Sequence, residues 1–152
     1  MNSLNNSLSP RPPVRKVWVF GALVAAGIGF ADALYLAVNH YRQVIPPCTV
    51  GSCESVLTSR FAIIAGVPIS LVGVAAYALI VFLLLLYIDR SNVKVLKWVA
   101  GLAAISFAVS VALVFLQLFV IRAICIYCMV SALSDTFLFV MTIPFWKITS
   151  RV

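Results

Sequence analysis

The sequence predicts an all-α membrane protein: a four-transmembrane-helix bundle with an external cysteine-bearing loop and a short amphipathic lid helix. Of its 152 residues, 64% are apolar and 10% are charged, and the mean hydropathy is +1.14. Soluble domains carry about 25% charged residues, so this composition excludes a soluble enzyme. At roughly 20 residues for each span, the length leaves room for four or five helices and for no second domain.

Four apolar runs predict the helices. The first is interrupted by Asp32 and the fourth by Asp135, and the most polar residue of the third is Gln117. The runs lack the alternation of barrel strands, so we expect helices. The third and fourth runs together are too long for one span, and the chain therefore turns near Arg122. The predicted spans are residues 17–38, 67–88, 99–121 and 123–143.

The basic residues predict the orientation of these spans. Eight of them lie in the two tails and in the loop between the second and third spans, against three in segment 39–66 and the Arg122 turn. Lys and Arg mark cytoplasmic loops. We therefore expect a disordered cytoplasmic tail over 1–16, a membrane domain over 17–146 and a cytoplasmic tail over 147–152. This topology explains the net charge of +7 without nucleic-acid binding.

Four cysteines fall on the predicted outer side. Cys48 and Cys53 lie in the external segment, and Cys125 and Cys128 form a Cys-Ile-Tyr-Cys motif in the first turn of the fourth span. Unpaired N–H groups at a helix N-terminus favour a thiolate, and sulfurs three residues apart can cycle between dithiol and disulfide. This pattern predicts thiol-disulfide chemistry. Two structural disulfides remain an alternative. A four-thiolate metal site is another, because Cys-x-x-Cys is also a zinc spacing.

The segment around the first cysteine pair predicts a mobile shuttle. Cys48 and Cys53 enclose a turn-forming sequence that follows two prolines. The connection from Cys53 to Val67 is long enough for Cys53 to reach Cys125. Apolar residues in this connection are interspersed with Ser, Thr and Arg, so we expect a short amphipathic helix that lies on the membrane surface as a lid.

Asp135 is a candidate for proton transfer. Carboxylates inside a membrane are costly and usually functional, and Asp135 lies two helical turns beyond Cys128 on nearly the same face. It could relay a proton to a reduced quinone, or it could be a protonated carboxyl bonded to Ser131 or to another helix. A quinone is the expected acceptor because it dissolves in the bilayer, and aromatic rings such as those of Phe61 and Tyr127 could stack on it.

The cysteines and their surroundings resemble the vitamin K epoxide reductase family in its bacterial form. The matching features are the two cysteine pairs, the run from residue 53 to 59, Gly66-Val67-Pro68 at the start of the second span, and Gly73 and Tyr77 behind it. The resemblance covers roughly residues 17–145. It implies a four-helix bundle around a quinone in the inner (cytoplasmic) membrane of a bacterium.

The resemblance also implies a route for electrons. Cys48 would receive them from a reduced thioredoxin-like partner, Cys53 would exchange with Cys125, and Cys128 would face the quinone. The acceptor would be ubiquinone or menaquinone, with no metal. The protein would in this way support disulfide formation in exported proteins.

By the same resemblance, Ser59 would hydrogen-bond a quinone oxygen or the lid backbone, so Ser59, Phe61 and Asp135 form the predicted quinone-binding set. Two departures from the animal enzymes argue against epoxide reduction: the loop cysteines are closer together, and Ala132 stands where those enzymes carry a tyrosine. Many bacterial members carry a fused thioredoxin-like domain. Because this chain stops at Val152, we expect the partner to be a separate protein.

Three other interpretations remain open. The disulfide bond protein B family also has four helices and two external cysteine pairs, but there the Cys-x-x-Cys pair comes first. A metal-binding or metal-transport membrane protein could use the same four thiols. A structural membrane subunit could carry them as stable disulfides.

Overall fold

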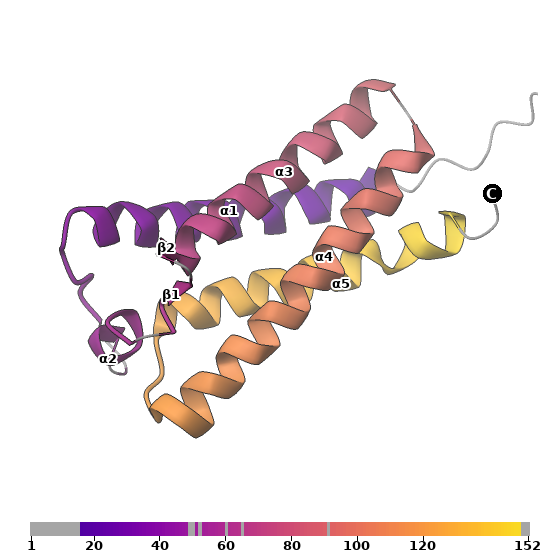
Figure 1. The fold of residues 1–152 in the computed structure, drawn as a ribbon. Coiled ribbons are helices and arrows are strands. Elements are labelled where there is room, and N and C mark those ends of the chain that lie inside the picture. Colours follow the sequence, from indigo (N-terminus) through magenta and orange to yellow (C-terminus); the bar gives the residue numbers. More distant parts are fainter. Residues whose placement is uncertain are drawn as a thin grey trace, which may run out of the picture.

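The computed structural model describes residues 16–149 except 49, 50, 52, 60, 65 and 91. Among the described residues, four helices are long and apolar enough to cross a membrane, which confirms the predicted fold class. A short helix and a two-stranded antiparallel hairpin lie between the first and second of them (Figure 1). In chain order the elements are α1 (Lys16–Tyr41), α2 (Cys53–Leu57), β1 (Ile63–Ile64), β2 (Val67–Pro68), α3 (Ile69–Arg90), α4 (Val93–Phe115), the π-helical segment η1 (Leu116–Ile121) and α5 (Ile126–Thr149).

Three helix starts differ from the predicted spans by two residues or more. The second span begins at Ile69 rather than at residue 67, because Val67 and Pro68 form strand β2. The third span begins at Val93 rather than at residue 99, because the Asn92 side chain caps it by accepting a hydrogen bond from the Lys94 backbone N–H at 3.0 Å. The fourth begins at Ile126, so Cys125 precedes the helix instead of lying in its first turn. Helix α5 continues to Thr149, past the predicted end of the membrane domain. The predicted tails lie largely outside the described residues.

The four long helices form a closed ring, in which α1 and α4 each pack against both α3 and α5. Helix α1 presents buried small residues to its neighbours, among them Ala26 and Gly29, and such residues let helix backbones approach closely. Gly29 lies against the ring of Tyr77 on α3. Large side chains outside the cavity lining, such as Phe82 and Phe20, stay 61% and 67% exposed, as is expected where apolar lipid is the natural solvent.

A network of buried and half-buried polar groups links the four long helices. Asp135 on α5 accepts a hydrogen bond from the hydroxyl of Tyr77 on α3 at 2.8 Å and another from Ser110 on α4. Ser131, one turn earlier on α5, donates to the carboxylate of Asp32 on α1 at 2.5 Å. Asp135 therefore bonds to other helices rather than to Ser131. Because polar groups in a bilayer need partners within the protein, this network favours one register of the helices.

The short elements cover the end of the bundle that lies opposite to the start of α1 and the end of α5 (Figure 1). The predicted lid helix is present only in part, as the five residues of α2, because Ile63 and Ile64, which the sequence predicts to lie in the same helix, form strand β1. After it, the Ser59 hydroxyl donates to the carbonyl of Val56 at 2.7 Å. The chain then forms the β1–β2 hairpin, where Gly66 adopts a φ of +82°, a left-handed conformation that glycine tolerates. We call α2 and the hairpin together the covering layer.

We expect Gly29→Ala to destabilise the bundle by about 1–3 kcal/mol, the usual cost of overpacking. A methyl group at this position would lie 2.3 Å from Cζ of Tyr77, and the displaced ring would lose its bond to Asp135. Gly27→Ala is the matched control, because no atom lies within 4 Å of a methyl group there. Thermal unfolding in detergent measures both variants. Equal melting temperatures would show that the Gly29–Tyr77 contact does not hold α1 against α3.

Candidate active site

Cys125 lies directly before α5, in a turn shaped by the end of the preceding helix. Arg122 adopts a left-handed conformation with a φ of 54°, and its N–H group bonds to the carbonyl of Gln117. The N–H group of Ala123 bonds to the same carbonyl at 3.1 Å. The side-chain oxygen of Gln117 accepts a hydrogen bond from the Cys125 backbone N–H, also at 3.1 Å. These bonds satisfy groups that helix ends leave unpaired and thereby position Cys125.

Gly51 holds the loop between α1 and α2 against this turn. It forms an isolated antiparallel β-bridge with Cys125. Its φ of +88° lies in the region that favours glycine, and a methyl group there would lie 2.1 Å from the carbonyl oxygen of Ile124. The close approach of the two backbones therefore requires glycine at position 51.

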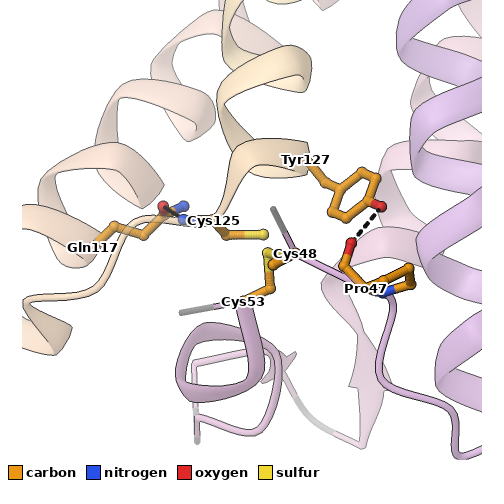
Figure 2. The surroundings of a disulfide bond; sticks show 6 residues. All are labelled: Pro47, Cys48, Cys53, Gln117, Cys125 and Tyr127. Atoms are coloured by element: carbon orange, nitrogen blue, oxygen red, sulfur yellow. Dashed lines mark hydrogen bonds between the residues drawn. A yellow bond between two sulfur atoms is a disulfide. The ribbon is translucent and has the colours of Figure 1, made fainter. Parts of the chain in front are cut away.

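The bridge places the loop disulfide beside the Cys-x-x-Cys motif. Cys48 and Cys53 form a disulfide, with Cα atoms 6.1 Å apart, whereas Cys125 and Cys128 are free thiols. Cys53 is 1% exposed and Cys125 is 0% exposed, and both belong to one buried cluster. Figure 2 shows the sulfur of Cys125 pointing toward the disulfide. The loop is thus docked on the motif, and the two cysteines expected to exchange lie together.

Tyr127, between the two cysteines of the motif, provides a second attachment for the loop. Its hydroxyl donates to the carbonyl of Pro47 at 3.2 Å, as Figure 2 shows. Its ring lies 5.4 Å from the ring of Tyr35 on α1, measured between centroids. The loop is therefore held on both sides of Cys48, at Pro47 through Tyr127 and at Gly51 through Cys125.

The hydrogen bonds at the start of α5 activate Cys125. The Cys128 side chain bonds to the Cys125 sulfur, and the backbone N–H groups of Cys128 and Tyr127 add further bonds. Backbone donors of this kind normally serve an N-cap side chain. Although burial opposes them, these bonds lower the pKa of Cys125 from 9.0 to about 6. Cys125 is therefore largely a thiolate at neutral pH, the form that takes part in disulfide exchange.

A cavity of about 480 Å³ lies between the four long helices and the covering layer. Its lining is mainly apolar, and its polar members include Cys128, Tyr77, Ser131 and Asp135. This size and character are typical of a pocket for a small apolar ligand with a few polar groups. Cys128 is the cysteine of the motif that lines the cavity, while Cys125 faces the loop disulfide.

The three residues predicted to bind a quinone occupy different places. Asp135 lines the cavity. The hydroxyl of Ser59 bonds to the Val56 carbonyl, which is the lid-backbone contact that the family resemblance allowed. Phe61 is half-buried in the segment that leads to the hairpin. Among the described residues that line the cavity, neither Ser59 nor Phe61 is present.

Sequence reasoning does not assign roles to Gly51 or Gln117. For Tyr127 it predicts only stacking on a quinone, but Tyr127 is absent from the described lining of the cavity. Gln117 carries a usable signal, because an amide in an apolar span needs hydrogen-bonding partners within the protein. Tyr127 is conspicuous as the aromatic residue of the motif, but its bond to Pro47 depends on where the loop docks. Nothing in the local sequence connects Gly51 with Cys125, because this contact joins distant parts of the chain.

A metal site receives no support from the part of the chain that the structure describes. No group of three or more His, Cys, Asp or Glu side chains there is arranged to hold a metal ion. Two of the four cysteines are joined in a disulfide, whereas a metal ligand is a deprotonated thiolate.

Comparison with known families identifies a match over most of the chain. The model described as the vitamin K epoxide reductase family matches residues 21–143, which cover most of the chain. The matched region includes both cysteine pairs and all four of the long helices over most of their length.

We expect the ionisation of Cys125 in the reduced protein to be half complete near pH 6. A variant with serine at both loop positions isolates the motif, and the ultraviolet absorbance of the thiolate, corrected with a Cys125→Ser control, follows the titration. Cys128→Ala removes the largest cause of the shift, so the midpoint rises toward 9.0. If the titration midpoint of Cys125 stays near pH 6 in the Cys128→Ala variant, the hydrogen bond from Cys128 is not the cause of the shift.

We expect Gly51→Ala to slow the joining of Cys53 to Cys125 by roughly tenfold or more, because small misplacements of reacting groups are costly. In a Cys48→Ser, Cys128→Ser background, mass spectrometry after mild oxidation measures the crosslink between the two remaining cysteines. Gly66→Ala is the matched control, because Gly66 also has a positive φ but no atom within 4 Å of an added methyl group. If both variants crosslink at the unmodified rate, the β-bridge does not position the loop.

Proposed function

Because this chain belongs to the vitamin K epoxide reductase family, whose members are membrane thiol-disulfide oxidoreductases, we propose that it transfers electrons from a protein dithiol to a quinone. The donor is a thioredoxin-like partner, and the route runs through Cys48 and Cys53 and then through Cys125 and Cys128. The observation that carries this proposal is the position of the motif: Cys125 faces the loop disulfide and Cys128 lines the cavity.

The first step is reduction of the loop disulfide. Cys48 is half-buried whereas Cys53 is 1% exposed, so a partner thiolate reaches the sulfur of Cys48. Its attack forms a partner–Cys48 disulfide and releases the thiolate of Cys53. The second thiol of the partner then attacks the partner sulfur that is bonded to Cys48, which frees Cys48. The partner becomes oxidised and the loop becomes a dithiol.

The second step moves the electrons to the motif. The thiolate of Cys53 attacks Cys125 in the Cys125–Cys128 disulfide, which forms a Cys53–Cys125 bond and releases Cys128. Cys48 then attacks Cys53 and displaces Cys125. A leaving thiol with a low pKa departs faster, and the pKa of Cys125 is about 6. The result is a loop disulfide with two free thiols in the motif, the redox state described above.

The last step uses the cavity. A quinone accepts two electrons and two protons, which are what the motif releases when its dithiol becomes a disulfide. The mainly apolar lining suits such a ligand, and Cys128, Tyr77 and Asp135 are among its polar members. We propose that Asp135 holds and passes a proton, since its carboxyl lines the cavity and bonds to the Tyr77 hydroxyl. Ser59 supports the covering layer, and a stacking role for Phe61 stays a prediction.

We place the protein in a bacterial cytoplasmic membrane, with both termini inside the cell. Lys16, Arg90 and Lys94 lie at the end of the bundle where α1 starts and α3 meets α4, while Arg42 and Arg122 follow helices that end beside the covering layer. The excess of basic residues favours the first end as cytoplasmic. The cysteines then face the outer compartment, where disulfides persist and where the thioredoxin-like donor acts.

The direct test counts thiols by mass in purified, mildly reduced protein before and after addition of a ubiquinone or menaquinone analogue without oxygen. We expect all four thiols to disappear, with two quinones reduced for each chain, because the formation of each disulfide from two thiols releases two electrons. Cys128→Ala serves as the control and stops quinone reduction. If the unmodified protein keeps its four thiols and the quinone is not reduced, the proposed function is excluded.

We expect Asp135→Asn to slow quinone reduction by about a hundredfold, the scale on which a positioned proton donor acts, and to leave thiol exchange between the loop and the motif unchanged. Stopped-flow absorbance of the quinone measures the first rate, and quenched mass spectrometry measures the second. Asp32→Asn is the matched control, because this second carboxyl bonds to Ser131 and is absent from the described cavity lining. If Asp135→Asn and the unmodified protein reduce the quinone at equal rates, Asp135 does not relay a proton.

A further inference from the structure

Gln117 is a buried amide at the end of the third span, on the segment η1. It is 2% exposed. Its backbone carbonyl accepts the two N–H groups that close the turn before Cys125, so its main chain is tied to the motif. A buried amide also needs partners for its side chain, which offers one carbonyl oxygen and one NH₂ group.

Both ends of this side chain contact the motif. The oxygen accepts the hydrogen bond from the Cys125 backbone N–H at 3.1 Å, as Figure 2 shows. The side chain also hydrogen-bonds the sulfur of Cys128, and the NH₂ group is its donor. One residue on η1 therefore spans the two cysteines at the start of α5.

We propose that Gln117 stabilises the thiolate released from Cys128 when Cys53 attacks the Cys125–Cys128 disulfide. This inference rests on the order of transfer in the proposed function. In that step the Cys53–Cys125 bond forms and the Cys125–Cys128 bond breaks. The electron pair of the broken bond stays on the sulfur of Cys128. The negative charge therefore passes from Cys53 to Cys128, and no further reactant is needed.

The surroundings of Cys128 explain why such a donor is needed. Its sulfur is released beside a mainly apolar cavity, where an isolated charge is costly. The backbone N–H groups of Tyr127 and Cys128 serve the sulfur of Cys125 instead. Hydrogen bonds to charged groups are roughly twice as strong as those between neutral groups, so the amide of Gln117 favours the released thiolate.

The test uses a Cys48→Ser variant, in which three cysteines share one disulfide. The bond exchanges between Cys125–Cys128 and Cys53–Cys125, and the second form leaves Cys128 free. Acid quenching followed by mass spectrometry of non-reduced peptides gives the ratio of the two forms. With Gln117→Met added, we expect the ratio to shift toward Cys125–Cys128 by about tenfold or more, from the loss of a hydrogen bond to a charged group.

Gln117→Glu separates stabilisation of the thiolate from support of the backbone. It keeps the size of the side chain and an oxygen for the Cys125 N–H group, but it removes the donor to Cys128. We expect a shift at least as large as that of Gln117→Met, and a ratio at the unmodified value would overturn the inference. This variant also keeps the question testable if Gln117→Met does not fold. Thr142→Ala, a fully buried change far along α5, controls for loss of packing alone.

The remaining outcomes distinguish this inference from the proposed function. If the variant with native Gln117 forms no Cys53–Cys125 disulfide, the order of transfer is wrong and the inference falls with it. If that disulfide forms and neither Gln117 variant moves the ratio, the inference alone is overturned. Quinone reduction by the unmodified protein, measured as above, then decides the proposed function independently.

Discussion

The bilayer's inability to satisfy backbone N–H and C=O groups is the constraint on which the rest of the structure depends. It makes each span a helix and confines irregular backbone to the ends of the bundle. The bonds of Gln117 to the turn, the left-handed residue Arg122 and the bridge from Gly51 to Cys125 all lie at such an end. The cysteine loop and the start of α5, whose N–H groups activate Cys125, are therefore both located where the spans stop.

Inside the bundle the same constraint acts on side chains. Asp135 and Asp32 receive hydrogen bonds from Tyr77, Ser110 and Ser131, so these two carboxylates connect helices that apolar packing alone would leave free to slide. Gly29 allows the ring of Tyr77 to approach α1. The network that fixes the helices also forms one wall of the cavity, which couples stability of the bundle to the site where we place the acceptor.

The two cysteines of the motif have different surroundings although they are one helical turn apart. Cys125 stands before α5, faces the loop and receives bonds from the Cys128 side chain and from backbone N–H groups at the start of the helix. Cys128 lies within α5 and lines the cavity. Cys125 can therefore exchange with the loop disulfide on the outer side, and Cys128 can donate electrons on the inner side. The helices need no large movement between these two steps.

The sequence by itself determined the four spans, the turn at Arg122 and the gathering of both cysteine pairs at one end, because hydropathy, charge and spacing are local properties. It also singled out Asp135, since a carboxyl in an apolar run is conspicuous. It placed the starts of α4 and α5 only approximately, because the cap at Asn92 and the turn before Ile126 depend on individual hydrogen bonds. Tertiary structure alone decided that Gly51 meets Cys125, that Gln117 spans the motif and that Tyr77 and Ser110 bond to Asp135. These contacts join residues far apart in the chain, and their geometry exists only once the helices have packed.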